Sequence, residues 1–368
     1  MFWGTHRDHP DKSWVFLNDG SRLVADLLRI EAEAVVVAGR LWPETRLPRS
    51  LVRAILLQPP LNAIDRDRLV FRVLAGDRDE DLLLLDHGDE LRGTAPDVVK
   101  PEPGEFHPEN IAWIIQGSVD PVELPLRNVT AILFAVDRPV PPPARHTQWV
   151  GLSDGSRLLS TSVARARNSL VFELPVGMTL ETDATGISEA NPFEAVVFLQ
   201  PRGGGLKYLS DLKPLGYKHI PFLSTTWPYK EDRNVSGGRL RSDDAVWLKG
   251  LGMHSSSRLA YEVPEPYAQL HGELSIDRRA GPRGSVVFRV YAENGEGEWR
   301  KVFESDIVRG GQSPVPMRVD LENAVRIALI VDFADRADQW DHANWLNLRL
   351  VAPESETGQE PTESSEPR

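Results

Sequence analysis

The sequence predicts an all-β protein: a C-terminal antiparallel β-sandwich of the jelly-roll type, preceded by small β-barrel-like repeat units. Apolar and polar residues alternate in short runs, and Gly, Pro, Asn or Asp separates most of them. Asp-Gly pairs stand between apolar runs, which is a hairpin signal because glycine accepts positive φ angles. The C-terminal part shows no convincing amphipathic helix of normal length. These three observations together favour strands throughout.

An internal repeat precedes residue 205. Residues 14–23 read WVFLNDGSRL, residues 149–158 read WVGLSDGSRL, and a weaker middle copy at residues 82–93 reads LLLLDHGDELRG. The copies also end alike, in LPRSLVRAILL, LPLRNVTAILF and NPFEAVVFLQ. Self-similarity of this kind indicates repeated structural units. Strand rhythm and turn placement weakly resemble small SH3-like or Sm-like barrels.

Proline and glycine clusters divide the chain into five predicted parts. These are a β-unit at 14–60, a second with an insert at 68–138, a third at 147–201, a β-sandwich at 205–352 and an acidic tail at 353–368. The tail is rich in Glu, Ser, Thr and Pro and lacks aromatic residues, so it cannot bury enough apolar surface to offset its ordering entropy. We therefore expect the tail to be disordered.

The first and third β-units are expected to superpose as residues 14–58 and 147–200. Their Asp19-Gly20 and Asp154-Gly155 turns should then occupy equivalent positions. The middle copy should match less well, because its extra length falls in residues 94–112.

The region from residue 205 to 352 contains many short alternating runs. They are RLAYEV at 258–263, QLHGELSI at 269–276, SVVFRVYA at 285–292, PMRVDL at 316–321, RIALIVDF at 326–333 and WLNLRLV at 345–351. Many short strands with regular turns are typical of a two-sheet antiparallel sandwich or jelly roll.

Four phrases of this region resemble a known family in their order and spacing. They are YLSDL at 208–212, LKGLGMHSSSRLAYEV at 248–263, SVVFRVYAENG at 285–295 and DHANWLNLRL at 341–350. Together they are similar to the NPCBM family of carbohydrate-binding modules. The resemblance implies a galactose-binding-like jelly roll that binds a glycan without cleaving it. It also suggests an extracellular or periplasmic setting, since members of the family are often secreted.

Sugar sites combine aromatic rings, which cover the apolar side of a pyranose, with polar groups that hydrogen-bond its hydroxyls. Six candidate sugar ligands follow from the family-like phrases and their surroundings: His254, Asn344, Trp345, Trp227, Arg258 and His342. Further aromatic candidates are Tyr229, Trp299 and Trp340. Structural alternatives stay open: His254 pairs with a backbone carbonyl or Asp341 inside the fold, and Trp345 packs in the core.

Aspartates recur at every third position in the phrase VDFADRADQWDHANW. Hard oxygen ligands gathered in one loop suit calcium. Asp332 and Asp341 are therefore candidate ligands of a structural Ca²⁺ site, and no other cofactor is expected. The spacing is not that of an EF-hand loop, and the alternative is a solvated connection between strands.

Composition limits the partners. The formal net charge is −12 and there is no cysteine. An acidic surface without Lys/Arg runs disfavours nucleic acid and anionic membranes, because binding phosphates needs clustered cations. No stretch approaches the length of a membrane span, and residues 1–14 lack the apolar core of a signal peptide. We expect neither a nucleic-acid nor a membrane partner.

No residue is assigned a catalytic role. The sequence has no G-x-S-x-G, P-loop or H-E-x-x-H motif, and neither half reads as alternating strands and helices. The expected function is non-catalytic recognition of a neutral glycan, with galactose-type sugars as candidates, and with the N-terminal repeats as a spacer or as an interaction surface for a protein partner. The alternative is a scaffold protein whose sandwich no longer binds sugar.

Overall fold

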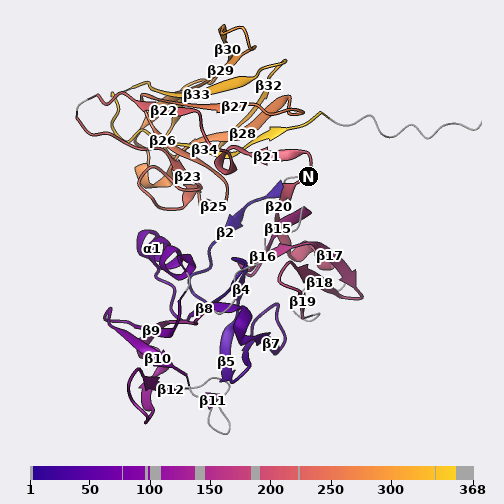
Figure 1. The fold of residues 1–368 in the computed structure, drawn as a ribbon, viewed down its shortest axis with the longest axis vertical. Coiled ribbons are helices and arrows are strands. Elements are labelled where there is room, and N and C mark those ends of the chain that lie inside the picture. Colours follow the sequence, from indigo (N-terminus) through magenta and orange to yellow (C-terminus); the bar gives the residue numbers. More distant parts are fainter. Residues whose placement is uncertain are drawn as a thin grey trace, which may run out of the picture. The chain divides into compact units, whose positions relative to one another are not determined.

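A computed structural model describes residues 3–76, 78–95, 98–99, 109–136, 146–183, 191–222, 224–335 and 337–353 (Figure 1). The chain forms two compact units. The N-terminal unit comprises Met1–Gly204 with Asp244–Trp247, and the C-terminal unit comprises Gly205–Asp243 with Leu248–Arg368. Both are built almost entirely from antiparallel strands, which confirms the all-β fold class. The acidic tail lies outside the described residues, apart from its first residue.

Three similar runs of elements make up the N-terminal unit, and each has a one-turn 3₁₀ helix before its last strand. The first run is β3 (Trp14–Leu17), β4 (Arg22–Val24), β5 (Asp26–Glu31), β6 (Ala34–Ala38), β7 (Thr45–Pro48), η1 (Arg49–Leu51) and β8 (Val52–Leu56). The second is β9 (Asp81–Leu85), β10 (Glu90–Thr94), β11 (Val98–Val99), β12 (Asn110–Ile115), β13 (Val122–Pro125), η2 (Leu126–Asn128) and β14 (Val129–Leu133). The third is β15 (His146–Leu152), β16 (Arg157–Ser160), β17 (Ser162–Ala166), β18 (Ser169–Leu174), β19 (Met178–Glu181), η4 (Pro192–Ala195) and β20 (Val196–Gly203).

The first strand of each run pairs with both the second and the last strand of that run. These trios join β1 (Trp3–Gly4) in one sheet with the order β1-β20-β15-β16-β4-β3-β8-β14-β9-β10-β12-β13. The middle strands of the first run form a smaller sheet with β11 of the second run, in the order β11-β5-β6-β7, and those of the third run form the sheet β17-β18-β19. Strand β2 (His6–Arg7) pairs with β25 (Ala245–Trp247).

The repeated Asp-Gly turns connect the first two strands of their runs. Gly20 and Gly155 have φ angles of 85° and 93°, and the amide of each donates to the carbonyl of a leucine three residues earlier at 3.0 Å. Gly88 of the middle run, with φ of 98°, makes the same bond. These glycines therefore adopt the positive φ angles that the sequence predicts for the turns. Most of the middle insert lies outside the described residues.

The serines of the repeated Asp-Gly-Ser-Arg phrase meet where the first and third runs join, at strands β4 and β16. Ser21 Oγ accepts from the backbone amide of Leu159 at 2.9 Å, and Ser156 Oγ accepts from that of Val24 at 2.8 Å. The two bonds are reciprocal, so one local sequence serves both sides of a pseudo-symmetric seam.

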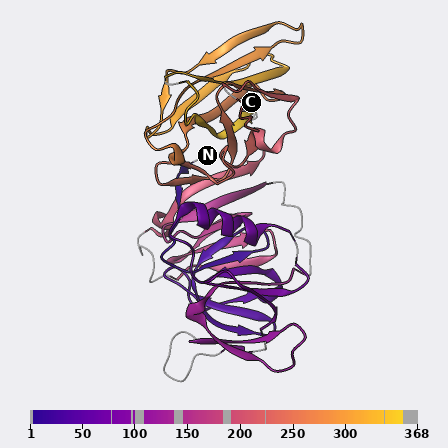
Figure 2. The same cartoon turned by 90° about the vertical axis from the view of Figure 1, so that its left-hand side faces the viewer.

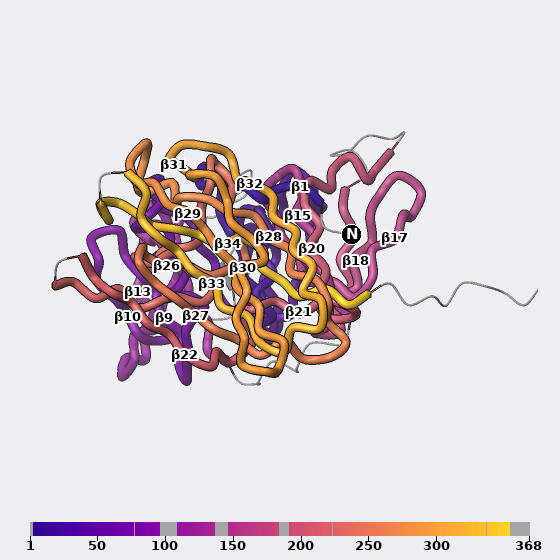
Figure 3. Tube along the Cα trace, turned by 90° about the horizontal axis from the view of Figure 1, so that it is seen from above, coloured from indigo at the N-terminus to yellow at the C-terminus, as the bar shows by residue number. Residues whose placement is uncertain are grey.

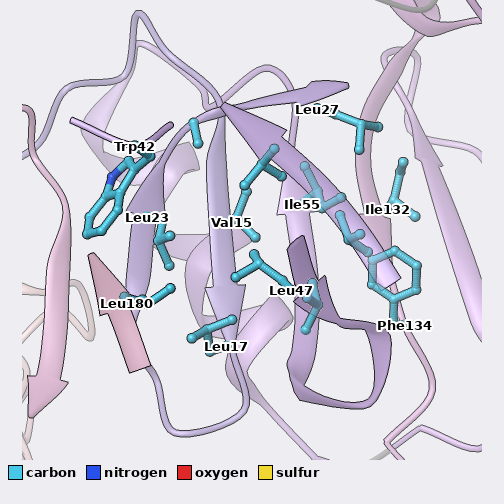
Figure 4. Packing of buried hydrophobic residues seen from close by; sticks show 14 of the residues in the cluster. Val15, Leu17, Leu23, Leu27, Trp42, Leu47, Ile55, Ile132, Phe134 and Leu180 are labelled. Atoms are coloured by element: carbon cyan, nitrogen blue, oxygen red, sulfur yellow. The ribbon is translucent and has the colours of Figure 1, made fainter. Parts of the chain in front are cut away.

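A buried apolar cluster fills the space between the large sheet and the smaller sheets (Figure 4). Figure 4 shows Val15, Ile55 and Ile132 of the large sheet in the same cluster as Leu47 and Trp42 of the first run. A second cluster lies under helix α1 (Ala63–Leu74), the only α-helix among the described residues (Figure 2). No helix in the described part of the chain is long and apolar enough to cross a membrane.

The C-terminal unit is a sandwich of two antiparallel sheets (Figure 3). The first, here called the β34 sheet, has the order β23-β26-β34-β28-β32, with β21 also pairing β34. The second, the β33 sheet, has the order β22-β27-β33-β29-β30, with β31 also pairing β29. Side chains from both sheets form one buried core. The expected β-sandwich is confirmed, and the described residues of this unit contain no α-helix.

The strands of this unit have the following bounds. In the β34 sheet they are β21 (Leu206–Tyr208), β23 (Lys230–Glu231), β26 (Gly250–His254), β28 (Gln269–Ile276), β32 (Val315–Asp320) and β34 (His342–Val351). In the β33 sheet they are β22 (Gly216–His219), β27 (Ser257–Glu262), β29 (Ser285–Glu293), β30 (Trp299–Glu304), β31 (Val308–Arg309) and β33 (Arg326–Phe333). Other short elements are β24 (Leu240–Ser242), η5 (Leu209–Asp211) and η6 (Arg278–Ala280).

Candidate functional site

Five ring side chains gather in the C-terminal unit and form what we call the aromatic cluster: His219, Trp227, His254, Trp340 and His342. Trp227 stacks on His254 with ring centroids 5.0 Å apart and planes 5° apart. His342 lies 5.7 Å from Trp227 and 5.5 Å from Trp340, and His219 meets His254 edge-on at 5.8 Å. The cluster joins three segments that are far apart in the sequence.

Strand pairing brings the two central imidazoles together. His254 ends β26 and His342 begins β34, and these two residues are opposite each other in the antiparallel register. Their ring centroids are 5.9 Å apart. The register of a sheet whose one face is buried is fixed by its apolar pattern, so this meeting of the rings is set by the fold of the β34 sheet.

The backbone of Trp227, in an irregular segment, is held by hydrogen bonds to two side chains. Tyr217 Oη donates to the carbonyl of Trp227 at 2.6 Å, and the amide of Trp227 donates to His219 Nδ1 at 3.2 Å. His219 Nε2 in turn donates to the carbonyl of Ser255 at 2.9 Å. Because His219 accepts at one nitrogen and donates at the other, it is the neutral tautomer protonated at Nε2.

Burial keeps the other two imidazoles neutral. Desolvation lowers the pKa of His254, and it lowers the pKa of His342 to about 4, with the neighbouring His254 acting in the same direction. His254 Nδ1 donates to the carbonyl of Ser255 at 2.9 Å, which leaves Nε2 as an acceptor. Within the described residues, neither His254 Nε2 nor the ring nitrogens of His342 make a hydrogen bond.

The solvent-facing part of the cluster is Trp340. Its side chain is 38% exposed, and its backbone has a positive φ of 63°. The guanidinium of Arg283 lies 3.7 Å from the centroid of the Trp340 ring. An exposed indole beside neutral imidazoles and a guanidinium offers one apolar face and several hydrogen-bonding groups in one place.

The structure separates the six predicted sugar ligands. His254, His342 and Trp227 come together in the aromatic cluster. Asn344 and Trp345 do not reach the surface, since both are 0% exposed. The Nδ2 of Asn344 donates to Asp277 at 2.8 Å, and Trp345 packs edge-on against a core phenylalanine at 4.8 Å. Both side chains are enclosed by the fold, and their contact with a sugar stays a prediction.

Arg258 is exposed but belongs to another surface. It lies on β27 in the β33 sheet, opposite Lys218 of β22. It is therefore not part of the aromatic cluster. Sequence reasoning missed His219, a member of the cluster, and Arg283, which lies next to it. Neither residue lies in a family-like phrase.

The two predicted calcium ligands, Asp332 and Asp341, have partners within the fold. Asp332 is paired with Arg289, and Asp341 is fully buried. Asp341 accepts from Ser255 Oγ at 2.7 Å and from the amide of Ser285 at 2.8 Å, and burial raises its pKa to about 6. No group of three or more potential metal ligands occurs within the described ranges. A metal ion at Asp332 and Asp341 therefore stays a prediction.

Several solved structures are similar to this chain. The CBM51-2 and INT domains of Clostridium perfringens ZmpB, solved with GlcNAc, show 25% identity and a TM-score of 0.35 over 52% of this chain and 40% of that chain. This chain thus spans less than half the length of that relative. A CBM51 from C. perfringens GH95, solved with methyl-galactose, shows 20% identity and a TM-score of 0.34 over 40% of this chain and 99% of that one.

A third structure contains tandem CBM51 modules of a family 98 glycoside hydrolase from Streptococcus pneumoniae. It shows 13% identity and a TM-score of 0.35 over 92% of this chain and 88% of that one. No curated protein matches this sequence. The family model described as the NPCBM/NEW2 domain matches residues 205–351, the stretch that contains the sandwich and the aromatic cluster. Residues 205–351 of this chain are therefore similar to the NPCBM/NEW2 domain family.

Proposed function

We propose that the C-terminal unit binds a neutral pyranose, of galactose type, at the aromatic cluster and does not cleave it. The NPCBM/NEW2 match supports a carbohydrate-binding module at residues 205–351. The single observation that carries the proposal is the exposed ring of Trp340 beside the neutral imidazole of His342. In this proposal the N-terminal unit acts as a spacer or interaction scaffold.

Neutral imidazoles suit sugar hydroxyls better than charged ones. A neutral ring has one donor nitrogen and one acceptor nitrogen, whereas imidazolium can only donate. A hydroxyl needs both kinds of partner, and His342 supplies both because its pKa lies well below neutrality. The guanidinium of Arg283 lies over one face of the Trp340 ring and adds donors there, and the rest of the indole would cover the apolar side of the pyranose.

Cleavage of a glycosidic bond needs two carboxyl groups on either side of the bond. Asp341, next in sequence to two members of the cluster, is fully buried and already accepts two hydrogen bonds. It offers no acid or base to a ligand on the surface. This supports a binding role without catalysis.

Calorimetric or NMR titration of the full chain with galactose and other neutral sugars tests the proposal. We expect weak binding, with Kd near 1 mM, or about 4 kcal/mol in total. Trp340→Ala and His342→Ala should each weaken binding by about 10-fold or more, since losing one hydrogen-bonding group costs about 1–3 kcal/mol.

Trp299→Ala is the matched control, because Trp299 is also exposed but lies on β30 in the other sheet. Circular dichroism would verify that each variant is folded. Unchanged affinity in folded Trp340 and His342 variants would place the sugar elsewhere. If the wild type bound no neutral glycan on an array, the scaffold alternative would replace the proposal.

A further inference from the structure

A groove of about 760 Å³ crosses the outer face of the β33 sheet. Its floor is made by Gly216, Ala260 and Ala328, which lie side by side on β22, β27 and β33 in the strand register. Three small residues in one row leave the sheet surface low between larger neighbours. The groove shares no lining residue with the aromatic cluster.

Aromatic side chains line the groove on the side of β29 and β30. Tyr291 of β29 is opposite Ala328 in the register, and Trp299 of β30 is 44% exposed. An indole exposed to this extent on a concave sheet face is available for stacking against a flat apolar ligand surface. A volume of this size is in the range of small-ligand sites, which run to about 300–1,000 Å³.

The charged residues that line the groove are all cations: Lys218, Arg258 and Arg326. Lys218 and Arg258 are opposite each other in the antiparallel register. Like charges directly opposite in a strand pair are destabilising. Neither side chain makes a hydrogen bond or ion pair with any other described residue. The placement of these two cations opposite each other therefore does not stabilise the sheet.

Arg326 is held in place from beneath. Its Nε donates to Glu293 Oε2 at 2.7 Å, and Glu293 is 0% exposed. Glu293 is fixed in turn by the backbone amides of Gly295 at 2.8 Å and Gly297 at 2.7 Å. The remaining guanidinium donors of Arg326 are thus presented from an anchored side chain.

The charge of the residues that line the groove is opposite in sign to the net charge of the protein. The formal net charge of the protein is −12, yet no carboxylate lines this groove. Clefts lined by one sign of charge concentrate ligands of the other sign. Guanidinium groups match carboxylates through paired hydrogen bonds.

We propose that this groove is a second ligand site, which binds an acidic saccharide whose carboxylate meets Arg258 and Lys218 while a sugar ring stacks on Trp299. Charge alone would also attract an acidic peptide. The apolar floor and the exposed indole favour a carboxylated pyranose instead. The inference is independent of the function proposed for the aromatic cluster.

Titration of the full chain with trigalacturonic acid and with sialyllactose tests this site. The matched neutral probes are the methyl ester of trigalacturonic acid and lactose, and the matched acidic peptide is tetraglutamate. Arg258→Ala and Trp299→Ala should each weaken binding of an acidic sugar at least 10-fold, and raised salt should weaken wild-type binding. The neutral probes should bind at least 10-fold more weakly in the groove than the acidic ones.

Two control variants separate this site from others. Lys207→Ala removes an exposed cation from β21 in the other sheet, and Trp340→Ala removes the exposed indole of the aromatic cluster. Lys207→Ala should leave acidic-sugar affinity unchanged, and Arg258→Ala and Trp299→Ala should still weaken acidic-sugar binding at least 10-fold in the Trp340→Ala background. Absence of binding to both acidic sugars, an equal loss in Lys207→Ala, or tighter binding of tetraglutamate that Trp299→Ala does not change would each overturn the proposal. A sulfated oligosaccharide that bound more tightly than the carboxylated ones would overturn the carboxylate assignment.

Discussion

Burial gives neighbouring ionisable residues of the β34 sheet opposite protonation preferences. Desolvation disfavours the charged form of any group, so it lowers the pKa of a histidine and raises that of an aspartate. His342 has its pKa lowered to about 4, and the adjacent Asp341 has its pKa raised to about 6. Compared with the unfolded chain, folding shifts both groups towards the uncharged form. Their contributions to stability therefore change with pH in opposite directions.

The sign for each residue follows from which state binds more protons. Between pH 4 and 6.5, unfolded His342 is protonated and the folded one is not, so its contribution is present above pH 6.5 and is lost as pH falls towards 4. Between pH 3.8 and 6, folded Asp341 is protonated and the unfolded one is not, so its contribution is present below pH 3.8 and is lost as pH rises through 6.

We expect these two effects to cancel partly in the wild type and to separate in variants. In His342→Gln, the free energy of unfolding of the C-terminal unit should fall relative to wild type on going from pH 4 to pH 7. In Asp341→Asn it should rise over the same interval. Each change should be on the order of 3 kcal/mol at most, at about 1.4 kcal/mol per pKa unit.

Native-state hydrogen exchange of β34 amides at several pH values measures this free energy for the unit concerned. The slope with pH is the decisive quantity, because either substitution also changes the absolute stability. Parallel slopes in wild type and both variants would show that these residues do not titrate as described.

At the level of elements, strand β34 shows where period-two reasoning fails. It lies between β26 and β28 in its sheet, and its residues are buried on both faces. The core of the sandwich covers one face. On the other side, Asn234 donates to Asp277 at 3.2 Å, the same carboxylate that Asn344 binds. A loop therefore covers the outer face, and polar residues there hydrogen-bond within the fold instead of facing solvent.

The arginines of the repeated phrase complete the seam between the first and third runs. Arg22 and Arg157 are opposite each other in the β4–β16 pair. Arg22 lies 4.0 Å from the ring centroid of Trp14, and Arg157 lies 4.9 Å from that of Trp149. Each repeat thus supplies an arginine and the tryptophan on which it packs. The sequence WV-x-L-x-DGSRL is shared because both copies build one side of this seam.

Helix α1 was missed because its apolar pattern is confined to its second half, where Leu69, Val70, Val73 and Leu74 pack into one cluster. Val70 and Val73 are buried, but most of the other positions are polar or exposed. Its start was readable: Asn62 Oδ1 accepts from the amides of Ile64 at 2.8 Å and Asp65 at 3.3 Å, which is an N-cap. The apolar face covers only about two turns, which is short for recognising a helix by its period.

Asn62→Ala should lower the free energy of unfolding of the N-terminal unit by about 0.5–2 kcal/mol, because two helix amides lose their acceptor. Asn62→Gly is the control and should lower it by only a few tenths of a kcal/mol. Urea unfolding followed by far-UV circular dichroism measures both. An equal effect of the two substitutions would mean that the side-chain cap contributes nothing.

On the scale of the whole molecule, the buried clusters follow the division into two units. The residues of two apolar clusters belong to the N-terminal unit and those of the third belong to the C-terminal unit. Because each unit has a core of its own, we expect two transitions in calorimetry of the full chain.

Trp345→Ala and Trp42→Ala assign those transitions, since both tryptophans are almost completely buried, one in each unit. Replacing a buried Trp by Ala typically removes about 3–5 kcal/mol. Trp345→Ala should lower or abolish only the C-terminal transition, and Trp42→Ala only the N-terminal one. A single transition that shifts as a whole in both variants would show that the units unfold together.

The sequence by itself determined the features that depend on neighbouring residues. Alternating runs specified strands, Asp-Gly pairs specified the turns at Gly20 and Gly155, and the phrases after residue 205 identified the sandwich. Both turn glycines have positive φ, a local property of the chain that distant contacts do not have to create.

Only the tertiary structure decided which polar and aromatic side chains remain accessible. Asn344 and Trp345 read as ligand residues but are buried, because accessibility depends on the segments that cover β34. Arg258 joined Lys218 across a strand pair, and His254 met His342 through the register of β26 and β34. Such meetings depend on which strands become neighbours, and segments far apart in the sequence decide that.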